Sequence, residues 1–485
     1  MDLVWLGFIL YLIIVFTIGI VAFKKNKTQE DFLLAGRNLG PWVAAISERA
    51  SGESAWMLLG LPGAAFAVAY GEVWTAVGSV TGIIFYWIFV ARKLREETEK
   101  YKALTVTEFL SSRFGDENNA IRWIASIIII FFYTAYVAAQ LSGAGKTLDI
   151  TFGIPNTWGI ILATVVVIFY TLCGGFLAVA WTDFFQGMIM VFTLVVLPVT
   201  GLFQLGGFEK ISIEVAKLGP KGTLFGGKTG LNAILQALSG MSWGLGYMAM
   251  PHLLTRFMAF KNPDDIAKGR IIAFCWAIPA FTGAVMIGLV GLGIKGANFA
   301  LKDADMLMPL LAKELLPAWF AGILISGAIA AMMSTADSQL LVVTSAVGED
   351  IYHKALGKEA SEKQQVFISR IVVLFVGVMG FILAITSKEL IMDMVSYAWG
   401  GLGAAFGPVI LLTLYWERVS RAGVLAGMLT GSIGTVIWKN IKTINDVIPE
   451  RLAVFVIALF AVIIVSLLTG NEEQPGEKLE NGKNN

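Results

Sequence analysis

Three charged side chains lie within six residues of each other in the segment SERASGESAW, residues 47–56, between two long apolar runs. They are Glu48, Arg49 and Glu53. An unpaired charge at the centre of a bilayer costs at least roughly 2.5–3.5 kcal/mol, so we expect each of these charges to have a partner. Arg49 and Glu53 are four residues apart and would share one face of a continuous helix. Two interpretations are open: the charges form a structural ion network, or at least one carboxylate contacts a substrate or couples to a proton.

A second polar group lies in the apolar segment AAMMSTADSQLLVVTSA, residues 330–346. It places hydroxyls and one carboxylate on adjoining helix faces: Ser334, Thr335, Asp337 and Ser338. Sodium is a hard cation and prefers oxygen ligands, as calcium and magnesium do. Hydroxyls, together with carbonyls freed at a helix break, could therefore form a sodium site. The alternative for the two hydroxyls of Ser334 and Thr335 is a hydrogen bond to their own helix.

Two aspartates stand inside apolar segments. Asp337 is the clearer case, because a carboxylate at membrane depth indicates a functional role by default. Asp183, in VAWTDFFQG, lies near the end of another apolar run. The alternative for Asp183 is that it caps a helix at the membrane interface.

Composition indicates a membrane protein. Of the 485 residues, 56% are hydrophobic and 15% are charged, whereas soluble domains carry about a quarter charged residues. The formal net charge of +1 favours no nucleic-acid partner. Cys173 and Cys275 lie in apolar runs and indicate neither a disulfide framework nor a zinc site. With only two histidines and no metal motif, we expect no enzymatic activity.

The segment QLSGAGKT, residues 140–147, is the nearest approach to a phosphate-binding loop. The motif requires glycine where Gln140 stands, and it requires a preceding strand, whereas a helix is predicted here. We therefore expect no ATP binding, and transport would be powered by an ion gradient.

Helices that cross the lipid bilayer must position these groups, and each needs about 20 mainly apolar residues. We predict thirteen spans, at residues 3–23, 42–66, 72–92, 121–145, 157–175, 178–204, 231–256, 270–293, 318–347, 366–386, 390–415, 422–438 and 451–469. Cytoplasmic loops carry an excess of lysine and arginine, and residues 90–115 form the most basic loop. We therefore predict a multi-pass plasma-membrane protein with the N-terminus outside and the C-terminus in the cytoplasm.

Two predicted spans contain breaks. SERASGESAW interrupts the second span, and SGMSWGLGYMAMP, residues 239–251, interrupts the seventh with several glycines and Pro251. Carbonyls freed at membrane depth must be buried or line a wet cavity. Spans 2–6 and 7–11 form two groups of five that each open with a break, a pattern typical of secondary transporters. The alternative is that the glycines serve close helix packing.

Several strings, in order along the chain, resemble the sodium:solute symporter family, most nearly its bacterial sodium/proline branch. They are DFLLAGRNLGPWVAAIS, WMLLGLPGAAF, YTLCGGFLAVAWTDFFQG, SWGLGYMAMPHLLTRFMA, GILISGAIAAMMSTADSQLLV and VSYAWGGLGAAFGPVI. The likeness covers residues 3–470, nearly the whole chain. It implies an all-α membrane protein with a LeuT-like fold of inverted five-helix repeats, about 13 transmembrane helices and sodium-driven uptake by alternating access.

The chain is expected to divide into six parts. Residues 1–41 hold the first helix and a cytoplasmic loop, 42–206 the first repeat, 207–229 an extracellular loop, 230–416 the second repeat, and 417–470 two peripheral helices. Residues 471–485 are polar and are expected to be a disordered cytoplasmic tail.

The resemblance also implies site residues, with sodium as the coupling ion and a small amino acid, proline first, as the substrate. The principal sodium site would comprise the carbonyls of Ala50, Glu53 and Ala331 and the hydroxyls of Ser334 and Thr335. A second sodium or proton site would comprise Ser54, Asp183, Asp337 and Ser338. The substrate pocket would be lined by Ser54, Tyr136, Trp243, Tyr247 and Pro251.

One stretch departs from the proline branch. Those symporters read ASDMSGW where this chain reads ASGESAW at residues 50–56, so their aspartate is Gly52 here and a carboxylate follows as Glu53. One residue along a helix is a rotation of about 100°, so Glu53 cannot simply take the place of that aspartate. Two other functions therefore stay open. One is transport of another small zwitterion or carboxylate, with sodium or proton coupling, and the other is a transporter-like membrane sensor.

Overall fold

The computed structural model describes residues 3–23, 29–173, 175–357 and 362–470, so the expected tail at residues 471–485 lies outside the described residues. The longer helices are α1 (Leu3–Phe23), α5 (Val73–Phe89), α8 (Ala120–Phe152), α9 (Asn156–Cys173), α10 (Phe176–Leu205), α15 (Asp265–Lys295), α17 (Ala318–Ser345), α18 (Glu362–Thr386), α19 (Ile391–Tyr415), α20 (Arg421–Asn440) and α22 (Glu450–Thr469). The shorter ones are α2 (Gln29–Leu34), α3 (Pro41–Gly52), α4 (Leu61–Val68), α6 (Ala91–Lys100), α7 (Val106–Arg113), α11 (Glu209–Lys217), α12 (Gly230–Met241), α13 (Trp243–Gly246), α14 (Pro251–Met258), α16 (Leu307–Leu315) and α21 (Lys442–Asn445). Single-turn and π-type segments are η1 (Ala35–Arg37), η2 (Trp56–Gly60), η3 (Ala69–Glu72), η4 (Gly219–Gly222), η5 (Ala304–Met306) and η6 (Ala346–Ala355).

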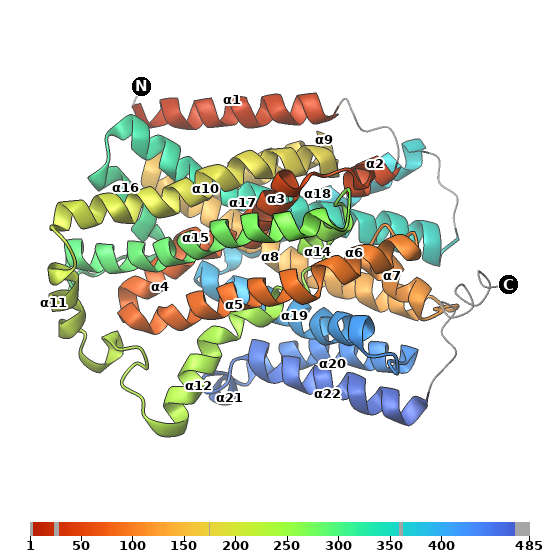
Figure 1. The fold of residues 1–485 in the computed structure, drawn as a ribbon. Coiled ribbons are helices and arrows are strands. Elements are labelled where there is room, and N and C mark those ends of the chain that lie inside the picture. The colour runs from red at the N-terminus through yellow and green to blue at the C-terminus, as the bar shows by residue number, and fades with distance from the viewer. Residues whose placement is uncertain (1–2, 24–28, 174, 358–361, 471–485) are drawn as a thin grey trace.

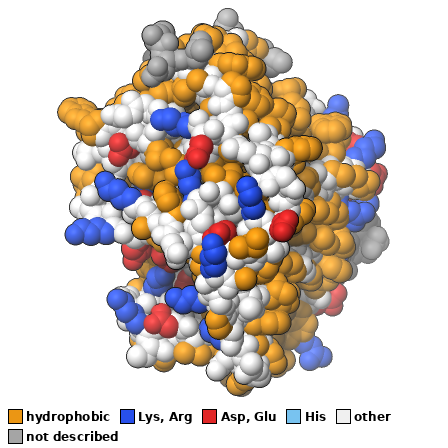
Figure 2. All heavy atoms as spheres, turned by 90° about the vertical axis from the view of Figure 1, so that its left-hand side faces the viewer, with side chains coloured by type: hydrophobic (Ala, Val, Ile, Leu, Met, Phe, Trp, Pro, Cys, Tyr) orange, Lys and Arg blue, Asp and Glu red, His pale blue; other side chains and the backbone are white. Residues whose placement is uncertain are grey.

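The long helices run side by side along one direction, from α1 at one edge to α20 and α22 at the other (Figure 1). α1 begins at the left-hand end of the bundle and α22 ends at the right-hand end, as an odd number of crossings requires. Figure 2 shows the left-hand end, where charged side chains of both signs are scattered over the face and hydrophobic side chains cover much of the flank. An apolar flank with polar ends is what a bilayer demands of a helical bundle.

Among the described residues, nine helices are long and apolar enough to cross a membrane. One of them, Trp56–Phe89, contains most of predicted span 3 together with the second half of span 2. Two further predicted spans carry shorter apolar stretches, Val4–Ile18 and Asn156–Phe169. The seventh predicted span is divided among α12, α13 and α14, because the chain leaves the helix at two points. Each of the thirteen predicted segments thus coincides with a helix or with an interrupted series of helices.

Both predicted breaks are present, and a proline starts a helical piece next to each. α3 begins with Pro41 and ends at Gly52, and the helix resumes at η2 after two non-helical residues. α14 begins with Pro251, and four residues separate it from the end of α13. Proline suits the first turn of a helix, because its fixed φ is helical and its missing N–H has no partner there in any case.

Glycines let α5 touch the backbone of the second broken segment. A Cβ added at Gly78 would lie 2.2 Å from the Cα atom of Met241, and one added at Gly82 would lie 2.3 Å from the carbonyl oxygen of Gly244. Small residues at such contacts allow helices in membranes to approach closely. Gly244 therefore does serve close helix packing, which was the alternative interpretation. The helix is nevertheless broken in this segment, so both interpretations hold.

Replacing Gly82 by alanine is expected to destabilise the protein, because the new methyl group overlaps the Gly244 backbone, which has no flexible side chain to yield. Overpacking of this kind costs about 1–3 kcal/mol. Thermal unfolding of the detergent-purified variant measures the loss. Gly348→Ala is the matched control, since nothing lies within 4 Å of its added Cβ. Equal stability of the two variants would contradict the close backbone contact between Gly82 and Gly244.

Candidate functional site

The break after α3 faces the middle of α17, and oxygen atoms from both meet there. The Ser334 hydroxyl donates to the carbonyl oxygens of Ala50 (3.0 Å) and Ala331 (3.1 Å). The Thr335 hydroxyl donates to the Ser51 carbonyl oxygen at 3.1 Å. All these residues are fully buried. Hydroxyl and carbonyl oxygens without any nitrogen or sulfur suit a hard monovalent cation, so the donor set fits sodium.

Four of the five residues expected at the principal sodium site are therefore brought together: Ala50, Ala331, Ser334 and Thr335. Both hydroxyls bond across to α3, and only Ser334 also bonds to its own helix. The Ser51 carbonyl joins the group and was not expected. Glu53, the C-cap of α3, was expected to contribute its carbonyl oxygen, and this stays a prediction. Its side chain contacts a different group of residues, described below. Among the described residues, no cluster of three His, Cys, Asp or Glu side chains could hold a metal ion.

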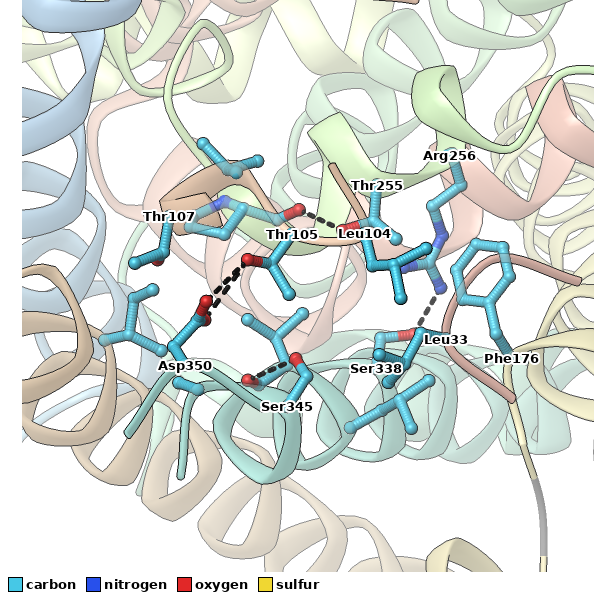
Figure 3. A pocket seen from close by; sticks show the side chains of 16 residues that line it. Leu33, Leu104, Thr105, Thr107, Phe176, Thr255, Arg256, Ser338, Ser345 and Asp350 are labelled. Atoms are coloured by element: carbon cyan, nitrogen blue, oxygen red, sulfur yellow. Dashed lines mark hydrogen bonds between the residues drawn. The ribbon is translucent and has the colours of Figure 1, made fainter. Parts of the chain in front are cut away.

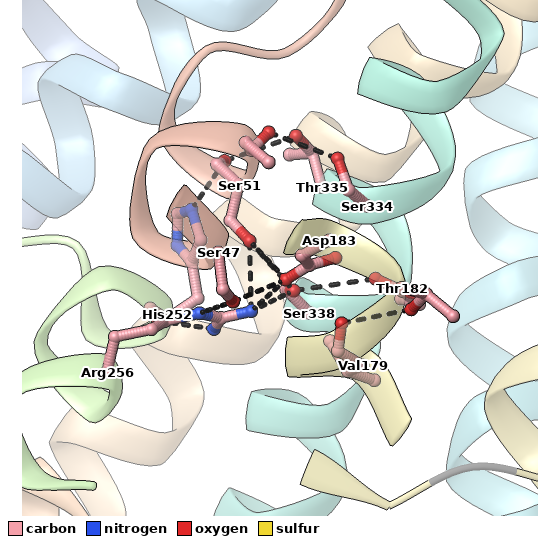
Figure 4. Close-up of polar contacts among 12 residues, drawn as sticks. Ser47, Ser51, Val179, Thr182, Asp183, His252, Arg256, Ser334, Thr335 and Ser338 are labelled. Atoms are coloured by element: carbon pink, nitrogen blue, oxygen red, sulfur yellow. Dashed lines mark hydrogen bonds and ion pairs between the residues drawn. The ribbon is translucent and has the colours of Figure 1, made fainter. Parts of the chain in front are cut away.

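A second polar group lies beside the first and is centred on Arg256 of α14 (Figure 4). Oδ2 of Asp183 accepts hydrogen bonds from Ser47 Oγ (2.8 Å), Ser51 Oγ (3.0 Å) and Arg256 Nη2 (2.9 Å). The same Nη2 donates to Ser338 Oγ at 2.5 Å. Two broken helices and two long ones, α10 and α17, thus meet at one buried guanidinium.

The expected second ion site is assembled only in part. Asp183 and Ser338 bind the same guanidinium nitrogen, and Ser338 Oγ donates to Asp337 Oδ1 at 3.4 Å. Ser54 lies apart from them, because its hydroxyl is 3.3 Å from Tyr136 Oη and accepts a hydrogen bond from the Gln140 side chain. The sequence reading missed Arg256. The available signal was an arginine inside the apolar string PHLLTRFMA.

An aromatic group closes the space between the two broken helices. The Tyr136, Trp243 and Tyr247 rings lie 6.3, 6.4 and 4.8 Å from the Trp399 ring, between centroids. Trp243 also stacks on Trp56 at 4.5 Å, with 13° between the planes. All five rings are at most 1% exposed. These rings are therefore closed off from solvent in this structure.

Four of the five residues expected in the substrate pocket therefore lie close together, since Ser54 joins Tyr136, and Tyr136, Trp243 and Tyr247 contact Trp399. Trp399 was not expected there. Its indole N–H donates to the Trp243 carbonyl oxygen at 2.9 Å.

Gly246 leaves room for the Trp399 ring, because an added Cβ would lie 1.9 Å from the indole nitrogen. Pro251, the fifth residue expected in the pocket, begins α14 and lines a different pocket.

That pocket is lined by residues of α2, α7, α14, α17 and η6, among others (Figure 3). Thr105 and Asp350 are hydrogen bonded across it at 2.9 Å. Arg256 and Ser338 form another part of its wall. Arg256 therefore belongs both to the second polar group and to the wall of this pocket.

The three charges of the opening segment form a closed network around Arg49. Its Nε donates to Glu48 Oε2 at 2.6 Å, its Nη1 donates to Glu53 Oε1 at 2.8 Å, and its Nη2 bonds the other Glu48 oxygen. Tyr86 Oη lies 2.5 Å from Nη2, and Tyr247 Oη donates to Glu53 Oε1 at 2.9 Å. Arg49 is thus shared by two buried carboxylates, and Glu53 Oε2 has no hydrogen-bond partner among the described residues. Through Tyr247 the network also reaches the aromatic group.

Comparison with known proteins identifies the family of the chain. Residues 32–431 match the model of the sodium:solute symporter family. The high-affinity proline transporter PutP of Bacillus subtilis is 38% identical over 93% of this chain and 95% of its own length. The sodium/proline symporter of Escherichia coli K12 is also 38% identical, over 95% of this chain and 92% of its own length.

Two solved structures share the fold. A sodium-coupled sialic acid symporter in a substrate-bound outward-open state has a TM-score of 0.79 at 19% identity, covering 96% of this chain and 98% of its own. A nucleobase-cation-symport-1 transporter in a closed conformation has a TM-score of 0.52 at 12% identity, covering 92% and 93%. The chain belongs to the sodium:solute symporter family, and it is a sodium-coupled membrane transporter with a LeuT-like fold, not an enzyme.

Proposed function

We propose that this symporter carries proline into the cell together with sodium. One observation supports the coupling most directly: residues 50–54 belong to both sites. The Ala50 and Ser51 carbonyls face the hydroxyls of α17, and the Ser54 hydroxyl lies against Tyr136 in the aromatic group. An ion that fixes this short segment also fixes the position of Ser54, so ion and substrate stabilise one conformation together.

The aromatic group suits proline in size and chemistry. Ring faces pack well against an apolar pyrrolidine ring, and they attract a positively charged nitrogen. Trp399 and Tyr136 supply rings beside Trp243, which itself stacks on Trp56 and lies under the Arg451 guanidinium. Ser54 and Tyr136 offer hydroxyls for the carboxylate. The relatives from B. subtilis and E. coli, described as transporters of proline, support this choice.

We also propose that residues 42–206 and 230–416 are the two inverted repeats, because each opens with a broken helix. In the proposed orientation, the N-terminus is outside and the C-terminus lies in the cytoplasm. The basic residues of α6 support it, since α6 lies at the end of the bundle where α22 ends (Figure 1), and basic loops stay in the cytoplasm. We place the protein in the plasma membrane.

Uptake of radiolabelled proline into proteoliposomes tests the function. We expect accumulation under an inward sodium gradient, and none when potassium replaces sodium or when only a proton gradient is imposed. Competition by unlabelled proline should abolish uptake, while other small zwitterions and carboxylates in equal excess should not. Absence of sodium-stimulated proline uptake would contradict the proposal, and stimulation by protons alone would favour the alternative coupling.

Replacing both Ser334 and Thr335 by alanine is expected to raise the sodium concentration for half-maximal uptake roughly tenfold, a loss of about 1.4 kcal/mol. The reason is that two oxygen atoms leave the group around the Ala50 carbonyl. Ser326→Ala is the matched control, because Ser326 is equally buried on α17 but bonds only its own helix, at the Gly322 carbonyl. An unchanged sodium dependence of the double variant would show that the principal site lies elsewhere.

We further propose that the network around Arg49 is structural. Replacing Arg49 by methionine leaves Glu48 and Glu53 buried without their cation, and breaking a buried pair costs about 3–5 kcal/mol. Thermal unfolding in detergent measures the loss. Arg92→Met is the control, because Arg92 is 57% exposed, and surface changes usually stay within about 0.5 kcal/mol.

The isosteric variant Glu53→Gln separates this role from proton coupling. If the network is structural, uptake per folded protein keeps its sodium dependence and its pH profile. A Glu53→Gln protein that folds but has a shifted pH profile would contradict the structural role.

A further inference from the structure

We propose that Arg256 is a tethered cation that fills the second ion position, so that the protein binds one sodium ion and not two. This inference rests on the proposed sodium site of α3 and α17. It concerns the group in Figure 4, where the guanidinium stands among oxygens that would otherwise hold a metal ion.

The contacts of Arg256 are those of an ion in a coordination shell. Its Nη2 lies 2.9 Å from Asp183 Oδ2, 2.9 Å from Ser51 Oγ and 2.5 Å from Ser338 Oγ. Its Nε donates to Ser47 Oγ at 3.2 Å. The side chain is 1% exposed. Its Nη1 donates to the His252 carbonyl oxygen. One carboxylate, three hydroxyls and one carbonyl thus surround a fixed positive charge, and a second sodium would compete with the guanidinium for the same oxygens.

Charge balance gives the same answer. Asp183 and Asp337 are both fully buried, and Arg256 neutralises only one of them. One oxygen of each aspartate, Asp183 Oδ1 and Asp337 Oδ2, has no hydrogen-bond partner. A single sodium at Ser334 and Thr335, one turn or less from Asp337 on α17, makes the whole group neutral. Buried charges are stable only when they are balanced, so one mobile cation is enough.

Ser51 connects the two positions. Its carbonyl oxygen accepts from Thr335 in the principal site, while its hydroxyl contacts Asp183, Arg256 and Ser338. Ser51 therefore bridges the Arg256 guanidinium and the proposed sodium site. Removing the arginine charge should accordingly strengthen binding at the principal site, whereas a purely structural role would weaken it.

A cation could enter the position once the arginine is shortened. Arg256 and Ser338 lie in the wall of the pocket in Figure 3, where Thr105 and Asp350 are further polar residues in a lining that is otherwise largely apolar. In a variant with a neutral residue at 256, this pocket leads to two buried carboxylates that lack their cation.

Equilibrium binding of radioactive sodium to the purified protein tests the inference without any transported substrate. We expect one bound sodium per wild-type chain, and two per Arg256→Gln chain with the first bound more tightly. Arg256→Lys keeps the charge and should bind one. Arg95→Gln is the matched control, since Arg95 is also 1% exposed but bonds the Phe260 carbonyl and Glu99, and it should bind one.

If the Arg256→Gln protein is not monodisperse, Arg256→Met takes its place in the measurement, because methionine is also neutral. Two sodium ions on the wild type would overturn the inference, and so would one on both the wild type and a folded neutral variant. Failure of the proline proposal would not alter these counts, because proline is absent from the measurement.

Discussion

The carbonyls released where α3 ends are the constraint on which the rest of the structure depends. A helix cannot stop inside a bilayer unless its free backbone groups find partners within the protein. Here the hydroxyls of Ser334 and Thr335 reach across from α17 to the carbonyls of Ala50 and Ser51. The break therefore fixes where α17 must lie, and it leaves a set of oxygens that a sodium ion can share.

Buried ion pairs and charged hydrogen bonds contact α3 on two opposite faces. Ser47 and Ser51, four residues apart, face Asp183 and Arg256. Arg49 is two residues from each serine, about 200° around the helix, and faces Glu48, Glu53 and Tyr86. Two arginines, one on each side, thus anchor α3 immediately before it unwinds. The carbonyls of Ala50 and Ser51 belong to the last turn of α3, directly after Arg49.

The sequence predicted the helices well, because apolar length and flanking charge are local properties of the chain. The positions of Ala50, Ala331, Ser334 and Thr335 followed from the family motif. Arg256 was not predicted, because its partners Asp183 and Ser338 lie on other helices, and its position in the chain suggested only the end of a span. Ser54 was assigned to two sites but contacts only Tyr136 and Gln140, since the direction of the chain after a break depends on tertiary packing.

The close contact made by Gly78 and Gly82 limits which helices can move relative to each other during transport. It presses α5, which belongs to the first half of the chain, against the backbone of α12 and α13 in the second half. The backbones are so close that sliding along this contact would force neighbouring side chains into a space that admits only glycine. The two halves of the chain are therefore locked together at this point, and we expect α5 and the second broken segment to move as one unit during transport.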